Sequence, residues 1–194
     1  SLWSGLIHSA KANIRRGHHN ARFFELGQCF SGTLVEDQVQ KIAGIICGNR
    51  YDSQWGNSDR AVDFFDTKAD VEALLSLSKN MYAFEEAEHP ALQIGQTAKI
   101  TKNNKVIGWI GALSPSLQKA LSMPNAFLFE INQDDIEDGE IACYEPFSAF
   151  QASQRDIAIV VSKEVSADQL INSIKSLKQD DLVDINLFDV YEGE

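Results

Sequence analysis

Apolar residues recur every four positions at the start of the chain and predict a first helix there. They are Leu2, Leu6, Ala10 and Ile14, which fall on one helical face. Arg15 and Arg16 bring positive charge to the last turn, where the helix dipole favours it, and Gly17 suits the residue after the end. The pattern therefore predicts a helix that ends near residue 17.

Alternating and continuous apolar stretches predict five strands after this helix. They cover residues 22–30, 42–47, 97–101, 106–113 and 126–131. In the first, Phe24, Leu26 and Phe30 share one side. The third and fourth are predicted to form a hairpin around the turn 102–105. Ser114 and Pro115 are predicted to start a short helix that ends near Leu121.

Between the second and third strands, residues 62–75 change from a strand-like to a helical pattern. Val62, Phe64 and Phe65 suit a short buried strand, and an apolar helical face follows. That face carries Val71, Leu74 and Leu75. Thr67 and Asp70 resemble a capping box, although Asp66 could cap instead. A strand that leads into a helix is typical of the middle of a layered α/β or α+β domain. The polar stretch 48–60 before it is predicted to be an exposed loop, long enough to be functional or mobile.

The acidic stretch 132–145, followed by Pro146, predicts a boundary between a domain of residues 1–145 and one of residues 146–194. In the second domain, residues 155–161 and 182–190 are predicted strands. Ser166 and Gln169 form a capping box for a helix between them. The prediction is a β-α-β unit with parallel strands and a right-handed crossover. One helix and two strands in about 48 residues cannot close a core, so we expect a domain that is cut midway.

The charge of the chain restricts its partners. The formal net charge of −11 argues against a protein that grips nucleic acid over its whole surface. Residues 1–22 carry a charge of +4 and residues 134–145 a charge of −6, which a solvated helix face and a solvated linker explain best. The three cysteines form no Cys-x-x-Cys pair, and no signal or membrane-spanning segment is recognisable. These features favour a soluble protein in the reducing cytoplasm, with no membrane partner.

The residues themselves predict no catalytic group and no metal site. No phosphate-binding loop, dinucleotide glycine pattern or zinc-protease motif occurs. Gly108-Trp109-Ile110-Gly111 is more typical of a strand that needs close backbone approach than of phosphate binding. Asp63, Asp66 and Asp70 could surround magnesium, but a helix N-terminus also favours such carboxylates, and we prefer that explanation.

Four stretches in the same order resemble the phenylalanyl-tRNA synthetase beta subunit family. They are Arg22-Phe23-Phe24-Glu25-Leu26-Gly27-Gln28-Cys29-Phe30, Asp63-Phe64-Phe65-Asp66-Thr67-Lys68, Gly108-Trp109-Ile110-Gly111-Ala112-Leu113-Ser114-Pro115, and the C-terminal stretch from Phe147 to Gly193. The sequence departs from the family pattern at four positions. Gln28 stands where Arg is usual, Ala69 replaces Gly, Ser114 replaces His, and Gln151 replaces Pro.

The resemblance implies an α+β fold. Residues 1–145 would form a class II aminoacyl-tRNA synthetase-like antiparallel sheet with flanking helices, and residues 146–194 the first, truncated part of a ferredoxin-fold anticodon-binding domain. Class II enzymes hold ATP phosphates with two arginines. In this chain Phe30 is followed by Ser31-Gly32, and strand 126–131 runs into acidic residues. The expected core is therefore non-catalytic.

The resemblance also implies a function and partners. The whole enzyme would attach phenylalanine to tRNA(Phe) using ATP and magnesium, neither of them bound by this part of it. It would be a heterotetramer of two alpha and two beta subunits, with catalysis in the alpha subunit. Arg155, Lys163, Lys175 and Lys178 are the candidate tRNA contacts, although residues 147–194 hold nine acidic residues against these four bases. The alternative is a synthetase-like stand-alone interaction module without a ligase role.

Overall fold

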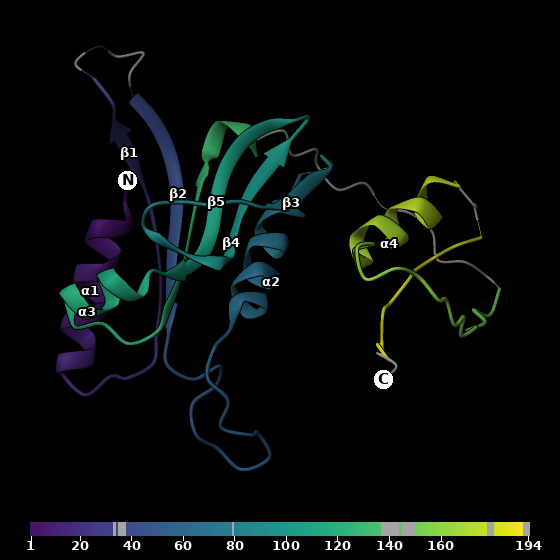
Figure 1. Cartoon of the computed structure of the whole chain (residues 1–194), viewed down its shortest axis with the longest axis horizontal. Helices are drawn as coiled ribbons and strands as arrows, with labels where there is room; N and C mark the ends of the chain where they lie inside the picture. The colour runs from purple at the N-terminus through teal and green to yellow at the C-terminus, as the bar shows by residue number, and fades with distance from the viewer. Residues whose placement is uncertain are drawn as a thin grey trace. The chain divides into compact units, whose positions relative to one another are not determined.

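The computed structural model describes residues 1–32, 34, 38–78, 80–136, 144, 150–177 and 181–191. It divides into two compact units, Ser1–Cys143 and Tyr144–Glu194 (Figure 1). The assignment of residues 1–145 and 146–194 to two functional domains stays a prediction.

A six-stranded antiparallel sheet forms the centre of the first unit. Its strand order is β1-β2-β6-β5-β4-β3. The strands are β1 (Ala21–Phe30), β2 (Gln38–Cys47), β3 (Tyr82–Glu86), β4 (Leu92–Lys102), β5 (Lys105–Leu113) and β6 (Ala126–Asn132). β6 pairs with β2 on one side and β5 on the other, so the last strand in the sequence lies in the interior of the sheet. The predicted α+β class with an antiparallel sheet is confirmed.

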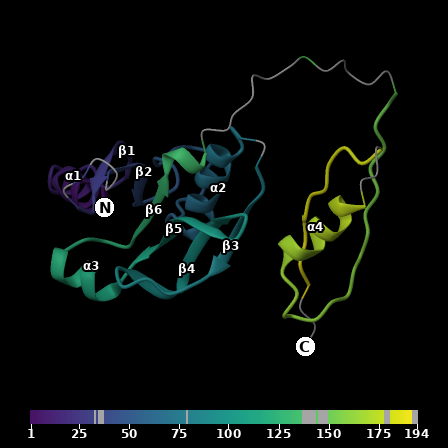
Figure 2. The same cartoon turned by 90° about the horizontal axis from the view of Figure 1, so that it is seen from above.

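Helices cover both faces of this sheet. On one face, α1 (Trp3–Arg15) and α3 (Pro115–Leu121) share an apolar cluster with Leu128 of β6 (Figure 1). On the other face, α2 (Phe64–Leu75) packs against Phe129, the next residue of β6 (Figure 2). Successive strand residues point to opposite faces, which explains why one strand serves both clusters. The helix predicted at the start of the chain and the one predicted at Pro115 are confirmed.

The N-terminus of α2 corrects two predictions. Phe64 and Phe65 lie in the first helical turn, so the short strand predicted at residues 62–65 is wrong. The capping box consists of Asp63 and Asp66 rather than Thr67 and Asp70, and Asp66 is not the N-cap. The Asp66 amide donates to Asp63 Oδ1 at 2.9 Å, and the Asp63 amide donates to Asp66 Oδ2 at 3.0 Å. These bonds satisfy two helix-end donors, which outweighs the strand preference of two phenylalanines.

The far edge of the sheet also differs from the prediction. β3 occupies residues for which we predicted no strand, and Lys99 of β4 pairs with Glu85 at 2.9 Å. The acidic residues of β3 show no strand pattern, and its partner β4 is separated from it in the sequence. The sequence therefore did not predict this strand. The predicted hairpin is confirmed and longer. Its turn, Asn103-Asn104, has φ values of 51° and 64°, as a type I′ turn requires.

The strand β1 lies at the other edge, and one of its faces is uncovered. Phe24, Leu26 and Phe30 share a side as predicted, but 79%, 52% and 66% of their surfaces are exposed. α2 packs on β5 and β6, on the same side of the sheet, and does not extend over these residues.

The second unit contains α4 (Ala167–Ser176), capped by Ser166 and Gln169 as predicted. The two strands predicted beside it are wrong. Residues 155–161 and 182–190 carry no strand assignment, and Val160 and Val183 are 99% and 90% exposed. A strand needs a hydrogen-bonded neighbour, and these two apolar stretches are not paired into a ladder. None of the described helices in either unit is long and apolar enough to cross a membrane.

Candidate functional site

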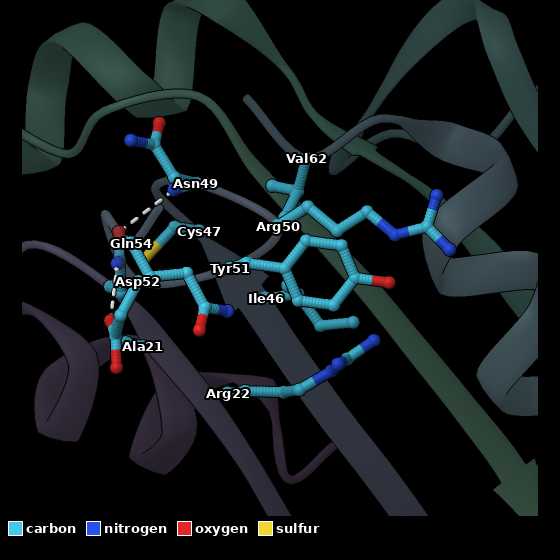
Figure 3. Close-up of a pocket in the computed structure, with 11 residues that line it drawn as sticks. Ala21, Arg22, Ile46, Cys47, Asn49, Arg50, Tyr51, Asp52, Gln54 and Val62 are labelled. Carbon is cyan, nitrogen blue, oxygen red and sulfur yellow. Dashed lines mark hydrogen bonds between the residues drawn. The ribbon is translucent and has the colours of Figure 1, made fainter. Parts of the chain in front are cut away.

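An open groove of about 530 Å³ lies where β1 begins and β2 ends, beside the loop 48–61 (Figure 3). It is lined by Asn20, Ala21, Arg22, Ile46, Cys47, Asn49, Arg50, Tyr51, Asp52, Gln54 and Val62. The loop was predicted from its polar sequence, but the groove was not, because β1, β2 and the loop meet only in the folded chain.

The loop beside the groove is fastened at its base. The Val62 amide donates to the Gly48 carbonyl at 3.0 Å, and the Arg50 amide donates to the Arg60 carbonyl at 2.9 Å. Asn20 binds the loop from outside it, because its side-chain nitrogen Nδ2 donates to Asp52 Oδ1 at 2.8 Å. The Asn20 side-chain oxygen also accepts from the Asn49 amide at 2.8 Å. Backbone and side-chain bonds therefore hold both ends of the loop against the sheet.

Two arginines border the groove, and both are paired with carboxylates of α2. Arg22 donates from Nε and Nη2 to Asp70 at 3.0 and 2.9 Å. Arg50 Nη1 lies 3.3 Å from Asp66, and its guanidinium lies 5.1 Å from the centre of the Tyr51 ring. Figure 3 shows both guanidinium groups on the same side of Tyr51, away from Asp52 and Gln54.

Asp66 joins the loop to the helix. Arg60 Nη2 donates to its carboxylate at 2.8 Å, while Arg60 Nη1 donates to Asp63 at 2.7 Å. Burial raises the pKa of Asp66, but the hydrogen bonds from Arg60 and the Asp63 amide, with the charges of Arg60 and Arg50, outweigh it and lower the pKa. The same hydrogen bond to Asp66 raises the pKa of Arg60. This cluster holds the loop to α2.

The charges around the groove do not favour an anionic ligand. Three arginines (Arg22, Arg50 and Arg60) face four carboxylates (Asp52, Asp63, Asp66 and Asp70), so the sum is −1. A triphosphate needs guanidinium groups that are not already neutralised. Asp63, Asp66 and Asp70 each form an ion pair with an arginine. In the part of the chain that the structure describes, no group of three metal-ligating side chains forms a metal site.

A second cluster of polar groups lies on the opposite face of the sheet. Glu130 of β6 accepts hydrogen bonds from the Leu2 amide at 2.8 Å, Lys41 Nζ at 2.7 Å and the Ser1 hydroxyl at 2.8 Å. Burial raises the pKa of Glu130, but these three hydrogen bonds and the Lys41 charge outweigh it, and the pKa is lowered. The carboxylate thus fixes the start of α1 to β2 and β6.

His89 lies between two tryptophans on this face. Its ring centre is 5.2 Å from that of Trp3 and 5.1 Å from that of Trp109. Burial lowers the pKa of His89, and the charge of Glu130 opposes this only in part. The ring contacts of His89 and the hydrogen bonds of Glu130 are typical of a packed core. No motif in the sequence pointed to His89 or Glu130.

The predicted tRNA contacts lie in the second unit, on separate segments. Arg155 is in the extended stretch before α4, where its Nη1 donates to the Gln154 carbonyl at 3.0 Å. Lys163 lies in a turn, and Lys175 in the last turn of α4. Lys178 lies outside the described residues. The RNA-binding role of all four stays a prediction.

Two protein families match this chain. The family described as "Phenylalanyl tRNA synthetase beta chain CLM domain" matches residues 1–133, and the family "Ferredoxin-fold anticodon binding domain" matches residues 148–194. Among curated relatives, the phenylalanine–tRNA ligase beta subunit of Nitrosococcus oceani is 39% identical over 199 residues, and that of Coxiella burnetii 39% over 197 residues.

The chain spans a quarter of the length of these relatives, although each match covers all of the chain. Among solved structures, a pyrrolysyl-tRNA synthetase of Desulfitobacterium hafniense matches 70% of this chain and 47% of its own, with a TM-score of 0.49 and 11% identity. That similarity is too distant to bear on fold or function.

Proposed function

Since the chain belongs to the phenylalanyl-tRNA synthetase beta chain family, we propose that it serves in the enzyme that joins phenylalanine to tRNA(Phe) using ATP and magnesium. The observation that carries this proposal is the match to two families in succession along the chain. A stand-alone module without a ligase role is not favoured, because the relatives at 39% identity are ligase beta subunits.

In this proposal, residues 1–145 are a class II-like core that assembles with the catalytic alpha subunit and does no chemistry itself. The arginine–carboxylate pairs support this role, because the three arginines near the groove are engaged by Asp63, Asp66 and Asp70. Further support comes from the opposite face, where Trp3, His89 and Trp109 pack together. The enzyme would be a cytoplasmic heterotetramer of two alpha and two beta subunits.

Residues 146–194 would contribute to the domain that contacts the tRNA anticodon region. Arg155, Lys163, Lys175 and Lys178 are its candidate phosphate contacts. Each lysine or arginine that neutralises a phosphate increases the affinity for RNA and also makes that affinity fall more steeply as the salt concentration rises. Replacing Lys175 with Glu is therefore expected to weaken tRNA binding and reduce its salt dependence, whereas the same change at Lys119 of α3 leaves both unchanged.

The proposal is tested by mixing the purified chain with the alpha subunit. We expect a stable complex in analytical ultracentrifugation, and no phenylalanine-dependent ATP–pyrophosphate exchange by the chain alone. Exchange by the chain alone would contradict the non-catalytic role. Failure to bind the alpha subunit would contradict the assembly role.

A further inference from the structure

Trp55 is the most exposed large apolar side chain among the described residues, with 100% of its surface accessible to solvent. It lies at the tip of the loop 48–61, in a turn where the Asn57 amide donates to the Gln54 carbonyl at 3.4 Å. Gly56 follows it with a φ of +91°, a conformation that favours glycine. The indole lies outside the set of side chains that line the groove.

The loop that presents Trp55 is held in place without help from the indole. Its base is fixed by the backbone bonds between Gly48 and Val62 and between Arg50 and Arg60, and by Asn20. Arg60 and Arg50 tie it to Asp66 of α2. An anchored loop loses little conformational entropy when its tip is bound, so the loop is preorganised for contact.

Tryptophan is among the residues that contribute most to protein interfaces, because it buries a large area with few rotatable bonds. The fully exposed indole buries no area among the described residues, so it contributes no packing to this unit. We propose that Trp55 anchors this chain to the alpha subunit by entering an apolar pocket on that subunit. The inference rests on the proposed function and adds to it the contact residue.

The charges of the loop favour a protein partner over RNA. Arg50 and Arg60 are balanced by Asp52 and Asp59 within residues 48–61, so the loop is neutral. Both arginines are also engaged by Asp66. Aromatic residues that stack on nucleic-acid bases work together with a positively charged surface for the backbone. Residues 48–61 carry no such excess of positive charge, and a neutral rim around one indole instead suits a buried apolar contact.

The first test measures binding of the alpha subunit to the Trp55→Ala variant by surface plasmon resonance. We expect at least about 30-fold weaker binding, the loss that corresponds to an interface hot spot. The matched control is Ile94→Ala, which shortens a side chain of β4 that is 74% exposed. It should bind as the unchanged chain does. Because Trp55 makes no packing contact, its variant should keep the same thermal unfolding midpoint.

The second test follows acrylamide quenching of the Trp55 fluorescence, taken as the difference between the unchanged chain and Trp55→Phe. The alpha subunit should shield the indole, and tRNA alone should not. Shielding by tRNA alone, or alpha-subunit binding that is unchanged in Trp55→Ala, overturns the inference while the assembly role stands. No complex between the unchanged chain and the alpha subunit would instead overturn the proposed function.

Discussion

At the scale of single residues, two buried carboxylates connect segments that are distant in the chain. Glu130 binds the start of α1 and Lys41 of β2, and Asp66 binds Arg60 and Arg50 of the loop 48–61. A buried charge is tolerated only when it is paired and hydrogen-bonded. Removing either carboxylate should therefore cost more than the loss of an exposed ion pair.

Replacing Glu130 with Gln should lower the free energy of unfolding by about 1–3 kcal/mol at pH 7, because Lys41 loses its partner. The pKa of Glu130 is lowered in the folded chain, so its stabilisation is present above the unfolded value of about 4.3 and is lost as the pH falls through the folded value. Urea unfolding at several pH values would check this. The difference between the variant and the unchanged chain should shrink in acid, and a constant difference would contradict the linkage.

Replacing Asp66 with Ala should destabilise the chain by about 2–3 kcal/mol, since it removes half of the capping box and the buried partner of Arg60. The loop 48–61 should also become easier to cleave, because Arg60 and Arg50 no longer tie it to α2. Denaturant unfolding and limited proteolysis with trypsin measure the two effects. Asp59→Asn, in the same loop, is the control and should change neither.

At the scale of elements, caps predicted from sequence were reliable where the capping residue stood directly before a helical pattern. Ser114 and Ser166 are examples, and both accept a bond from the third residue on. At α2 the aromatic pair Phe64-Phe65 suggested a strand, so the helix start was predicted too late and Asp63 was not recognised as the N-cap. Asp63 and Asp66 have the same three-residue spacing as Ser166 and Gln169, the capping box that predicted α4, and this spacing was the available signal.

The glycines of β5 show a constraint that the sequence did predict. A Cβ atom at Gly108 would lie 2.5 Å from the Glu130 carbonyl oxygen, and one at Gly111 would lie 2.7 Å from that of Gln96. Neighbouring strand backbones therefore approach too closely for any side chain. This close approach accounts for both glycines of the Gly-Trp-Ile-Gly stretch, and no phosphate-binding role is needed to explain them.

The change Gly108→Ala should destabilise the chain by about 1–3 kcal/mol, since the backbone must move to admit the methyl group. The matched control is Gly5→Ala within α1, where the new Cβ would meet Glu25 at 3.4 Å, an ordinary contact. That change should stabilise the chain by about 0.5–1 kcal/mol through the higher helix propensity of alanine. Thermal unfolding of both variants tests the pair, and equal effects would contradict the explanation.

At the scale of the whole molecule, sequence periodicity predicted the class of fold but not the order of the strands. β6 lies between β2 and β5, and β3 forms only because β4 offers it an edge. The groove was unpredictable for the same reason, since Arg22 and Arg50 become neighbours of Asp70 and Asp66 through pairings that no local pattern encodes.

The two units should differ in hydrogen exchange. Amides of β2, β5 and β6 are in ladders at the centre of the sheet and should exchange slowly. Residues 155–161 and 182–190 are extended and mostly exposed, without a ladder, and should exchange within seconds. Mass spectrometry of peptides after deuterium labelling measures this. Slow exchange in residues 155–161 would mean that they pair as strands in solution.

The uncovered side of β1 has a consequence for the chain in concentrated solution. Ten residues of strand lie at an open edge, and Phe24, Leu26 and Phe30 project from it into water. Such edges attract copies of themselves, and a lysine is a common natural deterrent. Light scattering should therefore give a negative second virial coefficient for the isolated chain. The change Phe24→Lys should move it towards repulsion and delay precipitation, even though the substitution makes the net charge less negative.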